Sequence, residues 1–141
     1  MRNWFLRGRS RERTAPRHLN NVIAGTGFYQ RMVGYVDDFS GVYDLDLRQV
    51  GSVDSIAANE EHAVRTSGGK VVGFVGGNSE SANAGNWHQV YDTSHSLVGL
   101  VDNASEMDSP DGRTLGSVVY NQGNGGTGWR RAGAALLLLI K

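Results

Sequence analysis

Hydrophobic and polar residues alternate along most of the chain, as in β-strands that have one face in a core and one in water. The stretch 41–50 shows this clearly, because Tyr43, Leu45 and Leu47 are separated by charged residues. The same pattern predicts strands over 21–36, with a break at 25–27, and over 70–75, 87–91, 95–102 and 113–120. About eight strands with turn signals every 8–12 residues are typical of an all-β sandwich or barrel.

Two segments depart from this alternation. Residues 54–64 are compatible with a short helix, since Ile56, Glu60 and Val64 would lie near one face. The run Ala134–Ile140 is apolar throughout. We predict a central strand there, buried on both sides.

The chain also repeats itself with an offset of 65 residues and no gap. VGYVD at 33–37 returns as VGLVD at 98–102, and GSV at 51–53 returns as GSV at 116–118. This alignment pairs 27–75 with 92–140, and the two copies are joined by a Gly/Asn/Ser-rich insert. We therefore predict an internally duplicated β domain over 21–141, folded as a β-sandwich or as small β-barrels whose halves share a core.

Three glycines stand inside the predicted strands in the same Val-Gly-x-Val setting, namely Gly34, Gly73 and Gly99. A glycine inside a strand usually marks a bulge, a barrel corner or a close approach of two backbones. Their recurrence predicts strongly bent strands and a barrel-like closure.

The net charge is zero because two opposite charges cancel. Residues 1–31 contain seven arginines and one glutamate, whereas residues 32–141 contain seven basic and thirteen acidic residues. We predict that residues 1–20 form an extended Arg-rich arm that docks on an acidic protein surface, on nucleic acid, or on another copy of the chain. The predicted partner-binding residues are an apolar plug and the arginines after it: Trp4, Phe5, Leu6, Arg7, Arg9, Arg11, Arg13 and Arg17.

Some acidic residues recur in the repeat. The pairs Asp37-Asp38 and Asp102-Asn103 occupy the same repeat position. A cation site or an acid–base pair is one interpretation, but Asp and Asn at strand ends more often cap turns, and we predict caps. The pairs Asp46/Arg48 and Asp111/Arg113 also recur, and for them we predict an ion pair across strands or a clamp on a turn.

No other group of residues forms a catalytic or ligand-binding motif. His88 and His95 flank Asp92, but two histidines and one carboxylate are an incomplete metal site, and the chain has no cysteine. Ser52 and Ser117 lack a neighbouring base, and the Gly-rich stretch 123–128 lacks the Gly-Lys-Ser/Thr of a phosphate loop. The sequence therefore predicts no catalytic residue, no metal and no cofactor.

Targeting signals are also not evident. The run Trp4–Leu6 is too short for the apolar part of a signal peptide, and Ala134–Ile140 is too short to span a membrane as a helix. The expected location is a virion if the protein is viral, and otherwise the cytoplasm.

Two resemblances follow from these residues. The turn and strand in DGRTLGSV (111–118) and DLRQVGSV (46–53) resemble the small-barrel signature of PRC-barrel and other SH3-like modules, in which an Asp-Gly turn leads into a Gly-x-Val strand. The first copy has Leu47 in place of the glycine. The whole chain is similar in style to the decoration, cement and fibre-tip proteins of tailed bacteriophages, which are small, Gly/Asn/Ser-rich, all-β and often carry a terminal arm.

The resemblance and the arm together imply a non-enzymatic virion protein that decorates or cements a capsid. Its expected partners are neighbouring subunits, of the capsid or of a homo-oligomer. One alternative is a small-barrel module that binds nucleic acid through the arm. Another is a fibre tip that binds a glycan through exposed aromatics such as Trp87, Tyr91 and Trp129.

Overall fold

The computed structural model describes residues 19–54, 61–76, 88–102, 105–119 and 128–140. These described residues form ten strands, one short 3-10 helix and one α-helix. The first hairpin consists of β1 (Asn20–Ala24), the 3-10 helix η2 (Gly27–Tyr29) and β2 (Arg31–Val36). The other elements are β3 (Gly41–Tyr43), β4 (Gln49–Val53), β5 (Glu61–Thr66), β6 (Val71–Gly76), β7 (His88–Asp92), β8 (Leu97–Val101), β9 (Glu106–Asp108), β10 (Thr114–Val119) and α1 (Gly128–Leu138).

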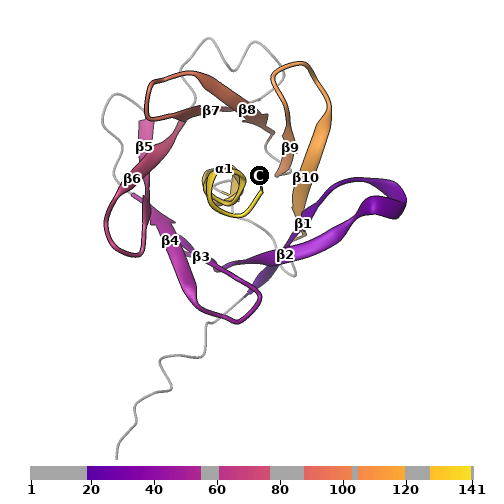
Figure 1. Cartoon of the computed structure of the whole chain (residues 1–141), viewed down its shortest axis with the longest axis horizontal. Coiled ribbons are helices and arrows are strands. Elements are labelled where there is room, and N and C mark those ends of the chain that lie inside the picture. The colour runs from indigo at the N-terminus through magenta and orange to yellow at the C-terminus, as the bar shows by residue number, and fades with distance from the viewer. Residues whose placement is uncertain (1–18, 55–60, 77–87, 103–104, 120–127, 141) are drawn as a thin grey trace, which may run out of the picture.

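The ten strands form one closed antiparallel barrel, and α1 runs along its lumen (Figure 1). Each strand pairs with its neighbour in sequence, and β1 pairs with β10 to close the ring. The all-β prediction is confirmed. Of the architectures that the sequence left open, the structure has a single barrel shared by both halves of the chain.

The barrel is built from five hairpins, β1–β2, β3–β4, β5–β6, β7–β8 and β9–β10, and the second strand of each has the same design. Its pairing register shifts by one residue directly before a glycine, which is the mark of a β-bulge. The bulged residues are Val33, Val50, Val72, Val98 and Leu115, and the glycines are Gly34, Gly51, Gly73, Gly99 and Gly116. The bends expected at Gly34, Gly73 and Gly99 are thus present, and there are five of them.

The five glycines make room for the helix. Each of the last five apolar residues of the chain packs its side chain against one of these glycines: Leu136 against Gly99, Leu137 against Gly73, Leu138 against Gly51, Leu139 against Gly34 and Ile140 against Gly116. A Cβ atom on any of these glycines would come within 2.6–3.2 Å of the facing side chain. Successive residues of this segment therefore contact every second strand around the barrel.

The rest of the lumen is lined by one residue from each strand, and all are almost completely buried. These residues are Val22, Val36, Val42, Val53, Val64, Val75, Val90, Val101, Met107 and Val118. They enclose Ala132, Ala134 and Ala135, which are also buried. The alanines of α1 thus pack inside the ring of lumen residues, and the leucines that follow pack against the strand glycines.

Four of the hairpins close with the same tight turn. The first residue is Asp44, Thr66, Asp92 or Ser109, and its side-chain oxygen accepts a hydrogen bond from the backbone N–H four residues later. The fourth residue has a left-handed backbone, and it is glycine at Gly69 and Gly112 but Leu47 (φ 66°) and His95 (φ 64°) in the other two turns. The turn that begins at Ser109 contains the sequence Pro-Asp-Gly.

Replacing Leu47 by glycine is expected to stabilise the barrel by about 0.5–1 kcal/mol, because a left-handed backbone costs a residue with a Cβ about 1–2 kcal/mol and glycine gains some freedom when unfolded. The Leu47 side chain is 54% exposed, so little packing is lost. Urea denaturation measures the change. The control is Leu45→Gly in the same turn, where φ is not positive and the substitution should lower stability.

Two predictions about secondary structure were wrong. The run Ala134–Ile140 is not a strand, since α1 extends from Gly128 to Leu138. The stretch 41–50 is not one strand, because β3 ends at Tyr43 and the alternating residues after it form a turn. In the stretch 54–64, where the sequence is compatible with a short helix, residues 61–64 belong to β5, and 55–60 lie outside the described residues.

The 65-residue repeat holds for three strands and then fails. It superimposes β2, β3 and β4 on β8, β9 and β10. The next elements of the first copy, β5 and β6, align with the start and the end of α1, which has a different structure. The smaller repeating unit of the fold is the bulged hairpin. In addition, β1 begins at Asn20, which was assigned to the arm.

Candidate interaction surfaces

The recurring aspartates cap turns, as predicted. Oδ1 of Asp37 accepts hydrogen bonds from the backbone N–H groups of Phe39 and Gly41, both at 2.9 Å. Oδ1 of Asp102 accepts one from the backbone N–H of Glu106 at 2.9 Å. These carboxylates fix the β2–β3 and β8–β9 connections, where each chain reversal leaves backbone N–H groups without a strand partner.

The recurring acid–arginine pairs clamp turns and do not join strands. Arg48 Nη2 lies 3.4 Å from Asp46 Oδ2, and Arg113 Nε lies 3.4 Å from Asp111 Oδ1. All four side chains are largely exposed, so each pair contributes little to stability. The hydrogen bond from the Ser109 hydroxyl, followed by the charge of Arg113, lowers the pKa of Asp111.

An apolar stripe crosses the outer face of the barrel from β5 to β8. Register places Ala63 opposite Phe74, Phe74 opposite Tyr91, and Tyr91 opposite Leu97, so these four side chains are neighbours on one face. Val75 and Val90, the next residues along β6 and β7, point into the lumen. We call Ala63, Phe74, Tyr91 and Leu97 the aromatic stripe.

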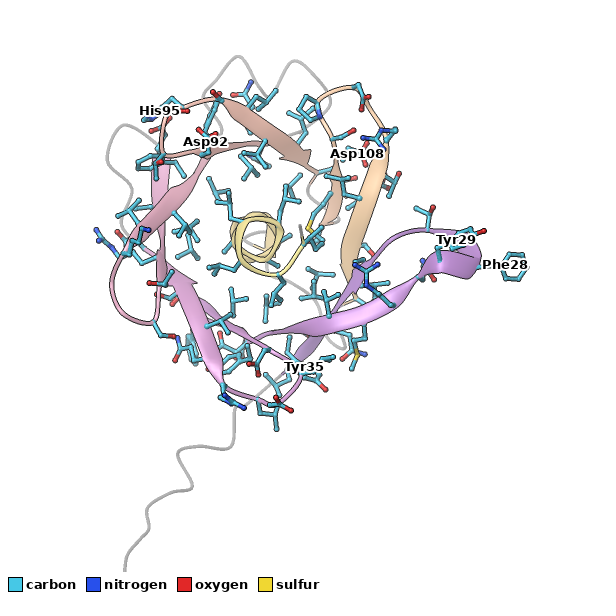
Figure 2. The ribbon with its side chains drawn as sticks, in the orientation of Figure 1. Phe28, Tyr29, Tyr35, Asp92, His95 and Asp108 are labelled. Carbon is cyan, nitrogen blue, oxygen red and sulfur yellow. The ribbon has the colours of Figure 1, made fainter. Side chains whose placement is uncertain are left out.

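His95 covers this stripe from the β7–β8 turn (Figure 2). Its ring stacks on Phe74, with a centroid distance of 4.7 Å and an interplanar angle of 16°, and lies 6.0 Å from the ring of Tyr91. Its Nε2 atom lies 3.2 Å from Glu61 Oε1. Burial, followed by the negative charge of Glu61, raises the pKa of Tyr91. Rings and a carboxylate therefore lie side by side on the outer face.

Two carboxylates lie close to the residues of the stripe. Glu61 is the first residue of β5, and Asp92 is the last residue of β7. Asp92 Oδ1 accepts hydrogen bonds from the Ser94 hydroxyl and from the backbone N–H groups of Ser94 and Ser96, and the Ser94 hydroxyl is the main cause of its lowered pKa. Asp92 thus keeps its negative charge at neutral pH. An aromatic surface with carboxylates beside it is chemically suited to a segment that is apolar and basic.

A second group of acids lies on β9. Glu106 and Asp108 are two residues apart on one face, and Thr114 Oγ1 donates a 3.2 Å hydrogen bond to Glu106 Oε2. Burial, followed by the hydrogen bond to Glu106 and its charge, raises the pKa of Asp108 to about 6. Asp108 Oδ1 is buried without a hydrogen-bond partner among the described residues. The folded protein therefore favours the neutral form of this acid.

Stability should consequently rise as the pH falls from 7 to 4. The raised pKa of Asp108 stabilises the fold fully below the unfolded value near 4, and this stabilisation is lost as the pH rises through about 6. Solvent screening reduces the effect to at most about 1 kcal/mol. Urea titrations at several pH values should show this slope flattened in Asp108→Asn. Asp111→Asn is the matched comparison, because the lowered pKa of Asp111 affects stability only below about pH 4, so this variant should keep the slope between pH 7 and 4.

The β1–β2 hairpin projects from the barrel and carries two exposed aromatic side chains at its tip (Figure 2). Phe28 is fully exposed and Tyr29 is 84% exposed. Their positions are fixed by η2, since the backbone N–H of Tyr29 donates to Thr26 and that of Gln30 donates to Gly27. A Cβ atom at Gly25 would lie 2.5 Å from the Tyr29 carbonyl oxygen, so only glycine fits beneath this tip.

Charge is distributed unequally between the two ends of the barrel. Strand order places the N-terminus of β1 at the end formed by the β2–β3, β4–β5 and β8–β9 connections, which we call the arm end. The loops described at this end contain no Lys or Arg, and the carboxylates there are Asp37, Asp38, Asp54, Glu61, Asp102 and Glu106. One of them, Asp54, is paired with Arg65 of β5, whose Nε lies 3.4 Å from Asp54 Oδ1. Acidic residues are therefore in excess in the part of this end that the structure describes.

The predicted partner-binding residues Trp4, Phe5, Leu6, Arg7, Arg9, Arg11, Arg13 and Arg17 all lie outside the described residues. Of the aromatics expected in a glycan site, Tyr91 belongs to the aromatic stripe, whereas Trp87 and the side chain of Trp129 also lie outside the described part. Within the described ranges, no three His, Asp or Glu side chains are grouped to hold a metal ion. In those ranges, no helix is long and apolar enough to cross a bilayer.

No family model, no curated protein and no solved structure matches the chain. The surfaces themselves are therefore the evidence about its function. Sequence reasoning missed the aromatic stripe and the Phe28–Tyr29 tip. The aromatic stripe is visible only from the strand register, because strand pairing brings Phe74, Tyr91 and Leu97 together. The second had a signal in the sequence, since two aromatics stand between Gly27 and Gln30 in a break between strands.

Proposed function

We propose that the protein is a non-enzymatic structural subunit of a virion, which decorates or cements a capsid through its N-terminal arm and its β domain. The observation that carries the proposal is the separation of charge. An Arg-rich segment precedes β1, and the barrel end where β1 starts has an excess of acidic residues. Oppositely charged surfaces on one chain favour contacts between copies and steer their association.

The barrel suits a structural role for a further reason. Its lumen is filled by α1, and each apolar residue from 136 to 140 contacts a different strand. Such a closed, filled barrel is a stiff body that has no sheet edge open to unwanted pairing. The projecting Phe28 and Tyr29 add an exposed aromatic tip of the kind that anchors protein contacts.

Binding of nucleic acid through the arm is the alternative. The carboxylates of the arm end would repel phosphates, so the described surface favours a protein partner. A filter-binding titration separates the two proposals. Tight binding of DNA or RNA that weakens steeply with added salt would support the alternative.

Deleting residues 1–18 tests the proposal. The deletion stops before Leu19 because Asn20 is buried in β1 and its Nδ2 atom donates to the Val36 carbonyl at 3.4 Å. We expect the full chain to form assemblies in sedimentation velocity and the shortened chain to be a monomer with unchanged circular dichroism. A full-length variant with serine in place of Arg7, Arg9, Arg11 and Arg13 should behave in the same way. Unchanged assembly of both variants, or a full chain that is always a monomer, contradicts the proposal.

A further inference from the structure

We propose that the aromatic stripe, with Glu61 and Asp92 beside it, is the surface that receives residues 4–9 of the arm of a second copy. This inference rests on the proposed function and names the docking site for it. The arm segment consists of Trp4, Phe5 and Leu6 followed by Arg7 and Arg9. The stripe has apolar side chains that match the apolar residues of this segment, and the carboxylates beside it match the arginines.

The apolar part of the arm matches the apolar part of the stripe. Phe74, Tyr91 and Leu97 are cross-strand neighbours on the outer face, and Leu97 is 39% exposed. Covering them with an indole, a phenyl ring and a leucine removes apolar surface of both partners from water. The plug would also lie edge-on or stacked against the rings, as aromatic pairs prefer.

The basic part of the arm matches the carboxylates and the rings. Glu61 lies 3.2 Å from His95, Asp92 follows Tyr91 in β7, and the His95 side chain is 54% exposed. An arginine guanidinium pairs with a carboxylate through two parallel hydrogen bonds and also stacks on an aromatic face. Arg7 and Arg9 follow the plug directly, so they would reach these groups while the plug covers the stripe.

The position of the stripe favours an arm from another copy. In the ring of ten strands, β6 lies five strands from β1, and Figure 1 shows β5 and β6 across the lumen from β1. An arm docking on its own stripe would have to follow the curved outer surface halfway around the barrel, which orders every residue at about 1–2 kcal/mol each. An arm from a neighbour would order only the docked residues, and residues 7–18 span up to about 40 Å when extended.

The strand that follows the donor arm, β1, and the acceptor stripe therefore lie on opposite sides of the barrel, and donor and acceptor are different parts of the chain. Such a contact is head-to-tail, and its repetition builds a closed ring or an open chain. A head-to-tail contact has a property that a symmetric contact lacks. A subunit with an inactive arm and a subunit with an inactive stripe can still bind each other, because one intact arm and one intact stripe remain to form a single contact.

Complementation of two full-length variants tests this. The donor variant is Trp4→Ser with Phe5→Ser, and the acceptor variant is His95→Gly with Leu97→Ser. Both acceptor substitutions are at exposed positions, and glycine suits the left-handed backbone of His95. The control is Leu47→Gly with Leu45→Ser, which makes the same kinds of change on the β3–β4 turn, where both leucines are exposed.

In native mass spectrometry we expect wild type and control to assemble, and each variant alone to be a monomer, with self-association weakened at least about tenfold. An equimolar mixture of the two variants should give a heterodimer. If the acceptor variant assembles like wild type, or the mixture stays monomeric, the stripe is not the receiving surface, and the proposed function is unaffected. If wild type itself is a monomer at all concentrations, both proposals fail.

Discussion

Replacing Gly51 by valine is expected to prevent the barrel from closing. A Cβ atom at this position would lie 2.3 Å from the carbonyl oxygen of Arg65 on β5 and 2.6 Å from Leu138 Cδ1 in the lumen. The first contact is with backbone, which cannot move without separating β4 from β5. The second is with the helix, which is held by four other glycine contacts of the same kind. We expect a loss of at least about 4 kcal/mol, a large part of the stability of a domain of this size.

Gly68→Val is the matched control, because it makes the same chemical change at an open site. A Cβ atom at Gly68 would meet only Thr66 Oγ1, at 3.8 Å, and its backbone is not left-handed. This variant should lose less than about 1 kcal/mol. Both are compared by urea denaturation followed by circular dichroism. Equal stabilities would show that the glycine–leucine contacts do not determine the closure of the barrel.

Replacing the five residues from Leu136 to Ile140 by alanine is expected to unfold the protein. Leu136 is 3% exposed, and the next four residues pack against the core from partly buried positions. Truncating a leucine or isoleucine at such positions costs about 1–3 kcal/mol, so five truncations cost as much as the whole stability of a typical domain. Single variants such as Leu137→Ala should remain folded, with a proportionally lower denaturation midpoint.

Exposed leucines provide the control for this experiment. Leu45→Ala with Leu47→Ala removes similar side chains from the β3–β4 turn, where both are about half exposed. The loss there should be within about 0.5 kcal/mol per residue. A folded five-alanine variant, or a control as damaging as a lumen variant, would contradict the view that the helix is the core of the barrel.

The sequence predicted the class of the fold well, and its error about α1 has a physical cause. A helix enclosed by a barrel is apolar on all sides, so Ala134–Ile140 lacks the polar face that identifies a surface helix. A strand buried on both faces has the same appearance in sequence. Alanine and leucine favour helix, but the 65-residue alignment with the β-branched Val71–Val75 outweighed that preference.

The error at 41–50 came from a turn that imitates a strand. Asp44 to Arg48 alternate in polarity because the turn exposes Leu45 and Leu47, not because it buries one face. The left-handed residue that would have revealed the turn is Leu47, where Gly69 and Gly112 occupy the corresponding positions of other hairpins. A leucine gives no such signal, and the strand prediction therefore continued through it.

The 65-residue repeat is present in the sequence, but the unit that repeats in the structure is shorter, namely one bulged hairpin. The motif Val-Gly-x-Val, with leucine for the first valine in the last copy, occurs at each of Gly34, Gly51, Gly73, Gly99 and Gly116. Counting it five times would have predicted five bulged hairpins. The aromatic stripe could not have been found in this way, because Phe74, Tyr91 and Leu97 become neighbours only through strand register.

Sedimentation velocity of the full chain over a range of protein and salt concentrations tests the central claim most directly. If a basic arm docks on an acidic barrel, the chain should form species larger than a monomer at low ionic strength. Those species should dissociate when salt screens the charges over about 3 Å, as it does near 1 M. A chain that remains a monomer at every concentration, or an assembly that is insensitive both to salt and to deletion of residues 1–18, would contradict the account.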